Sequence, residues 1–191
     1  MKIAALSVPA ILLIALTACS PGTGDGEIVG GSPTDCITGT WDADVADLAA
    51  QMQAYLIEKG HPIISSTASG TQQLALTEDG YAGWAAENLQ FVTVFSPSEG
   101  ITVTTTQTHN GSMRADWGWD SDTVFGFSDI TDEGYDVETV SVVNGTSTTP
   151  SDMSVAEGGM SAVPITAQCE GDLLVTKAEG SPFTTTWHRI D

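Results

Sequence analysis

Hydrophobic and polar positions alternate over most of the chain that follows residue 70. This period-two pattern, in short runs rich in Thr, Val, Phe and Trp, is typical of β-strands that bury one face. Turn signals such as Glu78-Asp79-Gly80, Asn110-Gly111 and Asn144-Gly145 separate most of the runs. The runs predict nine strands: Thr71–Thr77, Tyr81–Ala86, Leu89–Phe95, Ile101–Thr108, Ser112–Asp120, Thr123–Ser128, Tyr135–Val143, Leu173–Ala178 and Phe183–Ile190.

One stretch before these strands has the helical period instead. Its apolar residues recur at helical spacing on one face: Val45, Leu48, Ala49, Met52 and Leu56. Asp42 or Asp44 can cap the start of this helix, and Gly60 followed by Pro62 ends it.

Short strands joined by tight turns predict a mainly β protein, an antiparallel up-and-down β-barrel of about 9–10 strands. The helix then follows the first strand, which carries Gly39-Thr40-Trp41. A sandwich of two sheets is the alternative. The segment 146–164 interrupts the rhythm with Pro150, Gly158, Gly159 and Pro164, so we expect a long loop there.

The N-terminus predicts export. Lys2 precedes the apolar run Ile3–Ala18, which is shorter than the roughly 20 residues that span a bilayer. Leu16-Thr17-Ala18-Cys19 resembles the lipobox of bacterial lipoproteins. That resemblance implies a signal peptide at residues 1–18, a lipid on Cys19, and a place at the extracytoplasmic face of the cell membrane. Several acyl chains would hold the protein there firmly.

A flexible tether is expected at residues 19–35, because Gly, Ser, Pro and Thr dominate that stretch. The folded domain is then 36–191. Cys36 and Cys169 form an even pair in an exported domain, so a disulfide is expected, with two buried free thiols as the alternative.

The net charge of the chain argues against anionic partners. Five Lys and Arg residues against 25 Asp and Glu residues give a formal net charge of −20. A chain this acidic repels nucleic acid and anionic membrane surfaces. Any membrane attachment is therefore apolar or covalent.

Residues near both ends of the folded part carry a second resemblance. Gly39-Thr40-Trp41 and Trp187-His188-Arg189 resemble the calycin superfamily of lipocalins and fatty-acid-binding proteins. The resemblance implies that Trp41 and Arg189 pack together and close one end of the barrel. A guanidinium over an indole face stabilises such a contact by roughly 0.5–2 kcal/mol.

Aromatic residues are the candidate ligand contacts. Trp117 and Trp119 lie on one face of their strand, and Phe125 and Phe127 alternate on the next. They form either a packed core or the wall of an apolar pocket. Tyr81 and Trp84, on a neighbouring hairpin, can add to the same surface.

No metal site, cofactor or catalytic residue is predicted. Asp129–Gly134 is similar to the first half of a calcium-binding EF-hand loop, but its twelfth position is Val140 and not Glu. His61, His109 and His188 lack zinc spacing, and no Gly-x-Ser-x-Gly motif is present. We therefore expect a protein that is not an enzyme.

Two functions remain. The first is a lipid-anchored, extracytoplasmic, lipocalin-like protein that binds a small hydrophobic ligand. The second is a non-catalytic envelope protein whose barrel is filled and whose acidic surface meets an unidentified protein partner. An interior cavity of several hundred Å³ would favour the first.

Overall fold

The computed structural model describes residues 33–148 and 159–191. Within these ranges the protein is mainly β, with ten strands and two helices, which confirms the predicted class. The expected signal segment, Cys19 and most of the expected tether lie outside the described residues. Neither described helix is long and apolar enough to cross a membrane.

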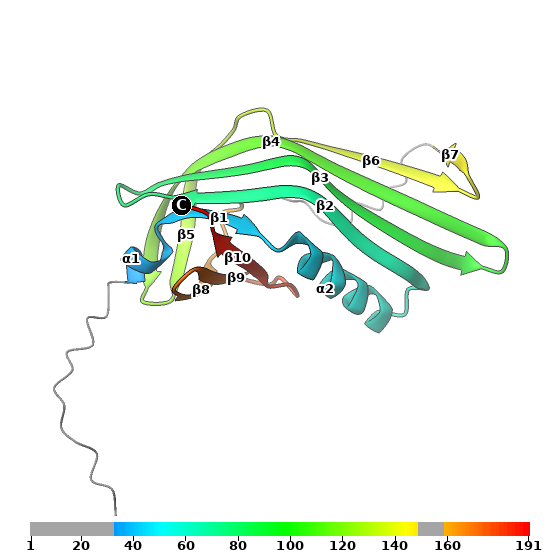
Figure 1. Ribbon diagram of the computed structural model, residues 1–191, viewed down its shortest axis with the longest axis horizontal. Coiled ribbons are helices and arrows are strands. Elements are labelled where there is room, and N and C mark those ends of the chain that lie inside the picture. Colours follow the sequence, from blue (N-terminus) through cyan, green and yellow to red (C-terminus); the bar gives the residue numbers. More distant parts are fainter. Residues whose placement is uncertain (1–32, 149–158) are drawn as a thin grey trace, which may run out of the picture. The chain divides into compact units, whose positions relative to one another are not determined.

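The elements follow one another along the chain as Figure 1 labels them. They are α1 (Pro33–Ile37), β1 (Gly39–Ala43), α2 (Val45–Glu58), β2 (Ile63–Leu76), β3 (Tyr81–Ser98), β4 (Ile101–Ser121), β5 (Val124–Asp132), β6 (Asp136–Val143), β7 (Thr146–Thr148), β8 (Ile165–Glu170), β9 (Leu173–Ala178) and β10 (Thr185–Arg189).

The antiparallel sheet closes on itself in a ring. Its pairings run in the order β3-β2-β1-β10-β9-β8-β5-β4, and β4 pairs with β3 again. The first and last strands of the described chain are neighbours in this ring, with Trp41 opposite Arg189. Apolar residues point inward, and Trp41, Phe125 and Leu174 are completely buried. Closure pairs the first strand with the last, but β1 pairs only with Gln73–Leu76 of β2 and β8 pairs only with Val124 and Phe125 of β5, so the ring is only partly paired there.

One hairpin leaves the ring, so the strand order differs from a simple up-and-down arrangement. β6 pairs with the N-terminal half of β4, whereas β5 pairs with its C-terminal half. β7 pairs with β6. β4 can serve both neighbours because it is long. The chain therefore passes from β5 out to β6 and β7 before it returns to the ring at β8.

β2, β3 and β4 are longer than the predicted strands and bend together (Figure 1). The register shifts at Ser69/Thr71 in the pairing of β2 with β3, and at Ala86/Leu89 in the pairing of β3 with β4. Such bulges bend a strand without ending it. The prediction of a hairpin turn at Asn110-Gly111 is wrong, because both residues lie inside β4. Gly111 has a φ of +98°, so the left-handed conformation occurs within a continuous strand.

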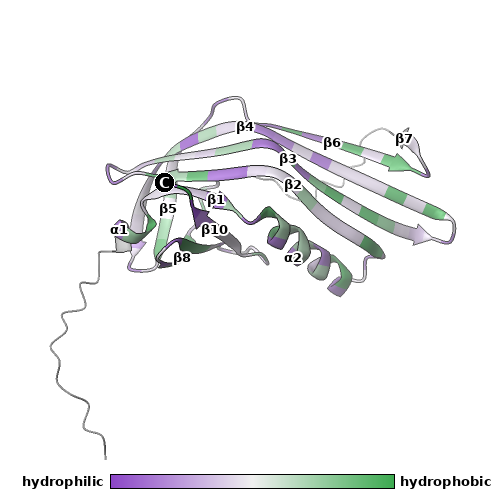
Figure 2. Cartoon of the chain, in the orientation of Figure 1, coloured by the Kyte–Doolittle hydropathy of each residue, from purple (hydrophilic) through white to green (hydrophobic). Residues whose placement is uncertain are grey.

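The helix after the first strand is confirmed as α2. Asp44 caps it, with its carboxylate accepting the N–H of Asp47 at 2.9 Å. Polar side chains on α2 attach it to the sheet: Gln51 Nε2 donates to the carbonyl of Thr184, and Gln53 Oε1 accepts the N–H of Ser66. Hydrophobic and polar residues alternate along the long strands beside it (Figure 2).

The predicted disulfide between Cys36 and Cys169 is present, and it joins α1 to β8. α1 begins at Pro33, so the last residues of the expected 19–35 tether are helical. The bond links segments that are 133 residues apart in sequence. It therefore restrains the beginning of the domain against its last third.

Candidate ligand-binding site

A cavity of about 330 Å³ lies inside the ring. Residues from α2, from seven ring strands and from two loops line it, so ring closure itself creates the space. The described lining residues are Leu48, Met52, Gln72, Leu74, Trp84, Leu89, Phe91, Gln107, His109, Phe125, Phe127, Gly159, Met160, Ser161, Ile165, Thr176, Ala178, Ser181, Phe183, Thr185 and Trp187.

The wall of this cavity is mostly apolar. Phe125 packs edge-on against Phe127, with the ring centroids 5.5 Å apart. Trp187 is buried, and its indole Nε1 donates to Thr176 Oγ1 at 2.8 Å. Trp187 and Thr176 satisfy each other's polar side-chain atoms, so they present their apolar surfaces to the cavity.

Some of the predicted aromatic residues meet at the cavity and others do not. Trp84, Phe125 and Phe127 line it. Trp117 and Trp119 are absent from the described lining and instead pack edge-on against Phe125. Trp117 is anchored where it lies, because its Nε1 donates to the carbonyl of Thr77 at 3.0 Å.

Tyr81 is placed differently from the prediction. It is 43% exposed and is not among the described residues that line the cavity. Its ring lies near Gly83, two residues along on the same strand. Strand alternation explains the result, because Tyr81 and Trp84 are an odd number of residues apart and face opposite sides of β3.

Sequence reasoning missed the polar part of the cavity. His109 on β4 lines the cavity and is 1% exposed. Its Nδ1 lies 2.6 Å from the hydroxyl of Tyr135. Its Nε2 is buried and has no hydrogen-bond partner among the described residues. Thr105, Gln107 and His109 share one face of β4, but polar residues at alternate positions carry no hydrophobic signal for burial. The apparent turn at Asn110-Gly111 also placed His109 outside the predicted strand.

Both partners of this pair are held neutral. Burial lowers the pKa of His109 below its ordinary value of 6.5. Burial raises the pKa of Tyr135 to about 12. The cause in both cases is desolvation, which disfavours the charged form. Trp84 and Phe91 pack edge-on against the rings of Tyr135 and His109, respectively, and fix their positions.

Trp41 and Arg189 are in contact, as the calycin resemblance implies for this pair. The guanidinium carbon of Arg189 lies 4.2 Å from the ring centroid of Trp41. Arg189 Nη1 also donates to the carbonyl of Thr38 at 2.7 Å. Gly39 permits this approach, because a Cβ at Gly39 would lie 2.1 Å from Nη1.

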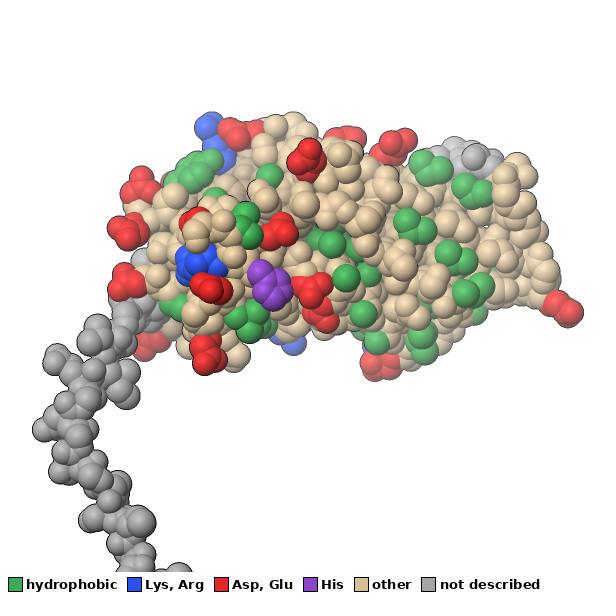
Figure 3. Space-filling model, in the orientation of Figure 1, with side chains coloured by type: hydrophobic (Ala, Val, Ile, Leu, Met, Phe, Trp, Pro, Cys, Tyr) green, Lys and Arg blue, Asp and Glu red, His purple; other side chains and the backbone are tan. Residues whose placement is uncertain are grey.

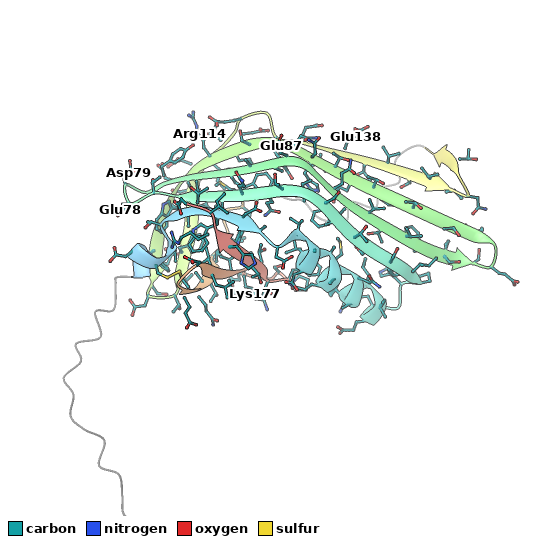
Figure 4. The ribbon with its side chains drawn as sticks, in the orientation of Figure 1. Glu78, Asp79, Glu87, Arg114, Glu138 and Lys177 are labelled. Atoms are coloured by element: carbon teal, nitrogen blue, oxygen red, sulfur yellow. A yellow bond between two sulfur atoms is a disulfide. The ribbon has the colours of Figure 1, made fainter. Side chains whose placement is uncertain are left out.

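Charged side chains lie on the outside. Acidic groups are spread over the face in Figure 3, where basic groups are few. Glu78, Asp79, Glu87, Arg114, Glu138 and Lys177 are all exposed (Figure 4). None of the described cavity-lining residues is Asp, Glu, Lys or Arg. The part of the chain that the structure describes holds no group of three His, Cys, Asp or Glu residues that could bind a metal ion.

Protein-family models, curated protein sequences and solved structures were compared with this chain, and none matches it.

Proposed function

We propose that this chain is a lipid-anchored, extracytoplasmic protein with a lipocalin-like β-barrel that binds a small hydrophobic ligand inside the barrel. The observation that carries the proposal is the 330 Å³ cavity within the closed ring. Sites for small molecules occupy about 300–1,000 Å³ and are mainly apolar. The cavity meets both criteria.

The cavity favours a binding protein over the alternative of a filled barrel with a structural role. Interiors of packed domains leave few voids larger than a water molecule. Here Leu74, Trp84 and Phe127 leave a space between them although each is buried or nearly so. A ligand that fills this space gains contacts that the empty protein lacks.

A fluorescence titration with a cavity-filling variant tests ligand binding. Ala178 lines the cavity, so Ala178→Phe would occupy part of its volume. We expect the wild-type protein to bind members of a panel of quinones, sterols and fatty alcohols with a change in tryptophan emission. Ala178→Phe should weaken that binding at least tenfold.

Leu173→Phe is the matched control, because Leu173 is 40% exposed on the same strand and lies outside the described cavity lining. It should bind as the wild type does. Equal binding by all three proteins would place the ligand elsewhere, and no binding by the wild type to any compound would overturn the proposal.

The proposed anchor has its own test. Cys19→Ala removes the thiol that the lipobox resemblance assigns to the lipid, whereas Ser20→Ala leaves it in place. Expressed in a bacterium with lipoprotein processing, the Ser20→Ala protein should remain with membranes, and the Cys19→Ala protein should not carry a lipid. Lipid-bearing Cys19→Ala protein would contradict the anchor.

A further inference from the structure

Among the polar residues that line the cavity, His109 stands out because one of its ring nitrogens is buried without a hydrogen-bond partner among the described residues. His109 is almost fully buried in a wall that also contains Phe91 and Trp84. A buried nitrogen without a hydrogen-bond partner costs roughly 1–3 kcal/mol, and native structures hold few of them. Nε2 of His109 is such an atom among the described residues.

The contact with Tyr135 indicates which ring nitrogen carries the proton. The hydroxyl of Tyr135 has one hydrogen-bond partner among the described residues, which is Nδ1 of His109. If the phenol donates to Nδ1, only the Nε2–H is left unsatisfied. If Nδ1–H donates instead, both the phenol hydrogen and Nε2 are left over. The first arrangement leaves fewer unpaired groups, so it favours a proton on Nε2.

We infer that the ligand is an uncharged, mainly apolar molecule with one hydrogen-bond-accepting oxygen, and that His109 binds this oxygen through its Nε2–H. This inference rests on the proposed function of the cavity. A carbonyl or ether oxygen would complete the hydrogen bonding of the imidazole, and the rest of the molecule would lie against Phe125 and Phe127.

The absence of charge on the cavity wall selects a neutral ligand over an anionic one. A carboxylate buried without a cationic partner pays a large desolvation cost. None of the described lining residues is basic. Arg114 and Arg189, the two arginines of the chain, have other partners, Glu133 and the carbonyl of Thr38 respectively.

Three naphthalenes of similar size test the inference: 2-acetylnaphthalene, 2-ethylnaphthalene and 2-naphthoate. Dissociation constants are measured by calorimetry for the wild type and for His109→Phe. We expect both proteins to bind the hydrocarbon. The preference for the ketone over the hydrocarbon should fall about tenfold in His109→Phe, which is the loss of one hydrogen bond.

Phe127→Leu is the matched control, because Phe127 lines the cavity but has no polar atom to offer. It should weaken the ketone and the hydrocarbon alike and leave their ratio unchanged. A comparison of ratios cancels the different hydration of the two compounds, and it isolates the polar contact from packing.

A measurement on the wild type covers the case in which His109→Phe does not fold. In a ¹⁵N-edited NMR spectrum, the His109 side chain should show a proton on Nε2. That resonance should shift when 2-acetylnaphthalene is added, and shift much less with 2-ethylnaphthalene. Tyr135→Phe should reduce the ketone preference a few-fold, because it removes the hydroxyl that fixes the tautomer.

The outcomes separate the two proposals. If the hydrocarbon binds and the ketone preference is the same in the wild type and His109→Phe, the inference fails while the binding cavity stands. Tightest binding of 2-naphthoate also overturns it. If none of the three compounds binds to the wild type, the proposed function fails, and the inference fails with it.

Discussion

At the scale of single residues, Arg189 organises the end of the ring where β1 and β10 meet. Its guanidinium lies over Trp41, donates to the carbonyl of Thr38, and lies 3.6 Å from a carboxylate oxygen of Asp191. A planar group with several donors can make all of these contacts at once, and a lysine ammonium cannot. The first and last strands are therefore joined by one side chain as well as by their pairing.

Arg189→Lys should lower the free energy of unfolding by about 2–4 kcal/mol, because it removes charge-assisted hydrogen bonds and stacking together. Urea unfolding followed by tryptophan emission measures this. Arg114→Lys is the matched control: Arg114 is exposed and pairs with Glu133 at 3.2 Å, so its loss should cost less than about 1 kcal/mol. Equal effects of the two substitutions would contradict the role assigned to Arg189.

His109 predicts a pH dependence of stability. Burial lowers its pKa in the folded state below 6.5, so the unfolded chain takes up a proton first as the pH falls. The stability that comes from burying neutral His109 is present above about pH 6.5 and is lost as the pH falls through the lowered folded-state pKa. Tyr135, the titratable group in contact with it, stays neutral over this range.

The difference in unfolding free energy between the wild type and His109→Phe isolates this effect from the many carboxylates that both share. We expect that difference to be constant from about pH 8 to pH 7 and to shift in favour of the variant below about pH 6.5. Urea unfolding at each pH measures it. Parallel pH profiles for the two proteins would show that His109 is not buried in neutral form.

At the scale of elements, the bend in the long strands depends on glycine. Gly70 on β2 has a φ of +87°, and a Cβ there would lie 2.1 Å from the carbonyl oxygen of Asn88 on β3. A Cβ added at Gly111 on β4 would likewise lie 2.1 Å from the carbonyl oxygen of Gly134. At both places the added Cβ would meet backbone atoms of the neighbouring segment. Backbone atoms cannot move aside as the end of a flexible side chain could.

Gly70→Ala should therefore destabilise the protein by about 3 kcal/mol or more, the sum of a left-handed backbone cost and a clash with backbone atoms. Gly100→Ala is the matched control, because Gly100 has a φ of +75° but no neighbour within 4 Å of the added Cβ. It should cost only about 1–2 kcal/mol. Thermal unfolding of both variants makes the comparison, and equal losses would show that the close approach does not matter.

The same region shows where local sequence signals stop being informative. The period-two pattern predicted runs that overlap seven of the ten described strands, but it split β3 and β4 into two strands each and did not include β1, β7 or β8. Asp44 and Gly60 marked both ends of α2. Asn110-Gly111 signals a positive φ, and this conformation occurs in a hairpin turn as well as in a bulge. Only the pairing of β4 with β3 and β6 decides between them, and those contacts are distant in sequence. The branch of β6 and β7 away from the ring was hidden for the same reason.

The candidate site was predictable to a similar extent. The alternating Phe125 and Phe127 indicated an apolar wall, and both line the cavity. The pair of His109 and Tyr135 could not be predicted, because 26 residues separate them and no short motif joins them. Their contact arises only when β4 continues through Gly111.

At the scale of the whole molecule, the disulfide and the pairing of β1 with β10 both connect the start of the folded domain to its last third. Cys36 and Cys169 join segments that are 133 residues apart, and β1, which follows Cys36 in the chain, pairs with β10. A crosslink over so long a loop removes much of the freedom of the unfolded chain. Its effect on stability is therefore expected to be large.

Replacing both cysteines, as Cys36→Ala with Cys169→Ala, should lower the free energy of unfolding by up to about 5 kcal/mol in the chain-entropy model. Urea unfolding of the oxidised wild type and the double variant measures the loss. Reducing agent should destabilise the wild type and leave the double variant unchanged. A wild-type protein that is insensitive to reductant, and as stable as the variant, would contradict the contribution of the bond.

Native mass spectrometry of the full chain, extracted gently from the membranes of a bacterium that processes lipoproteins, tests the central claim most directly. We predict a population whose mass exceeds that of the lipid-bearing polypeptide by one small molecule, which is lost on mild activation and is absent from Ala178→Phe. A protein that carries no such molecule, and that takes up none from a total lipid extract, would contradict a ligand-binding interior.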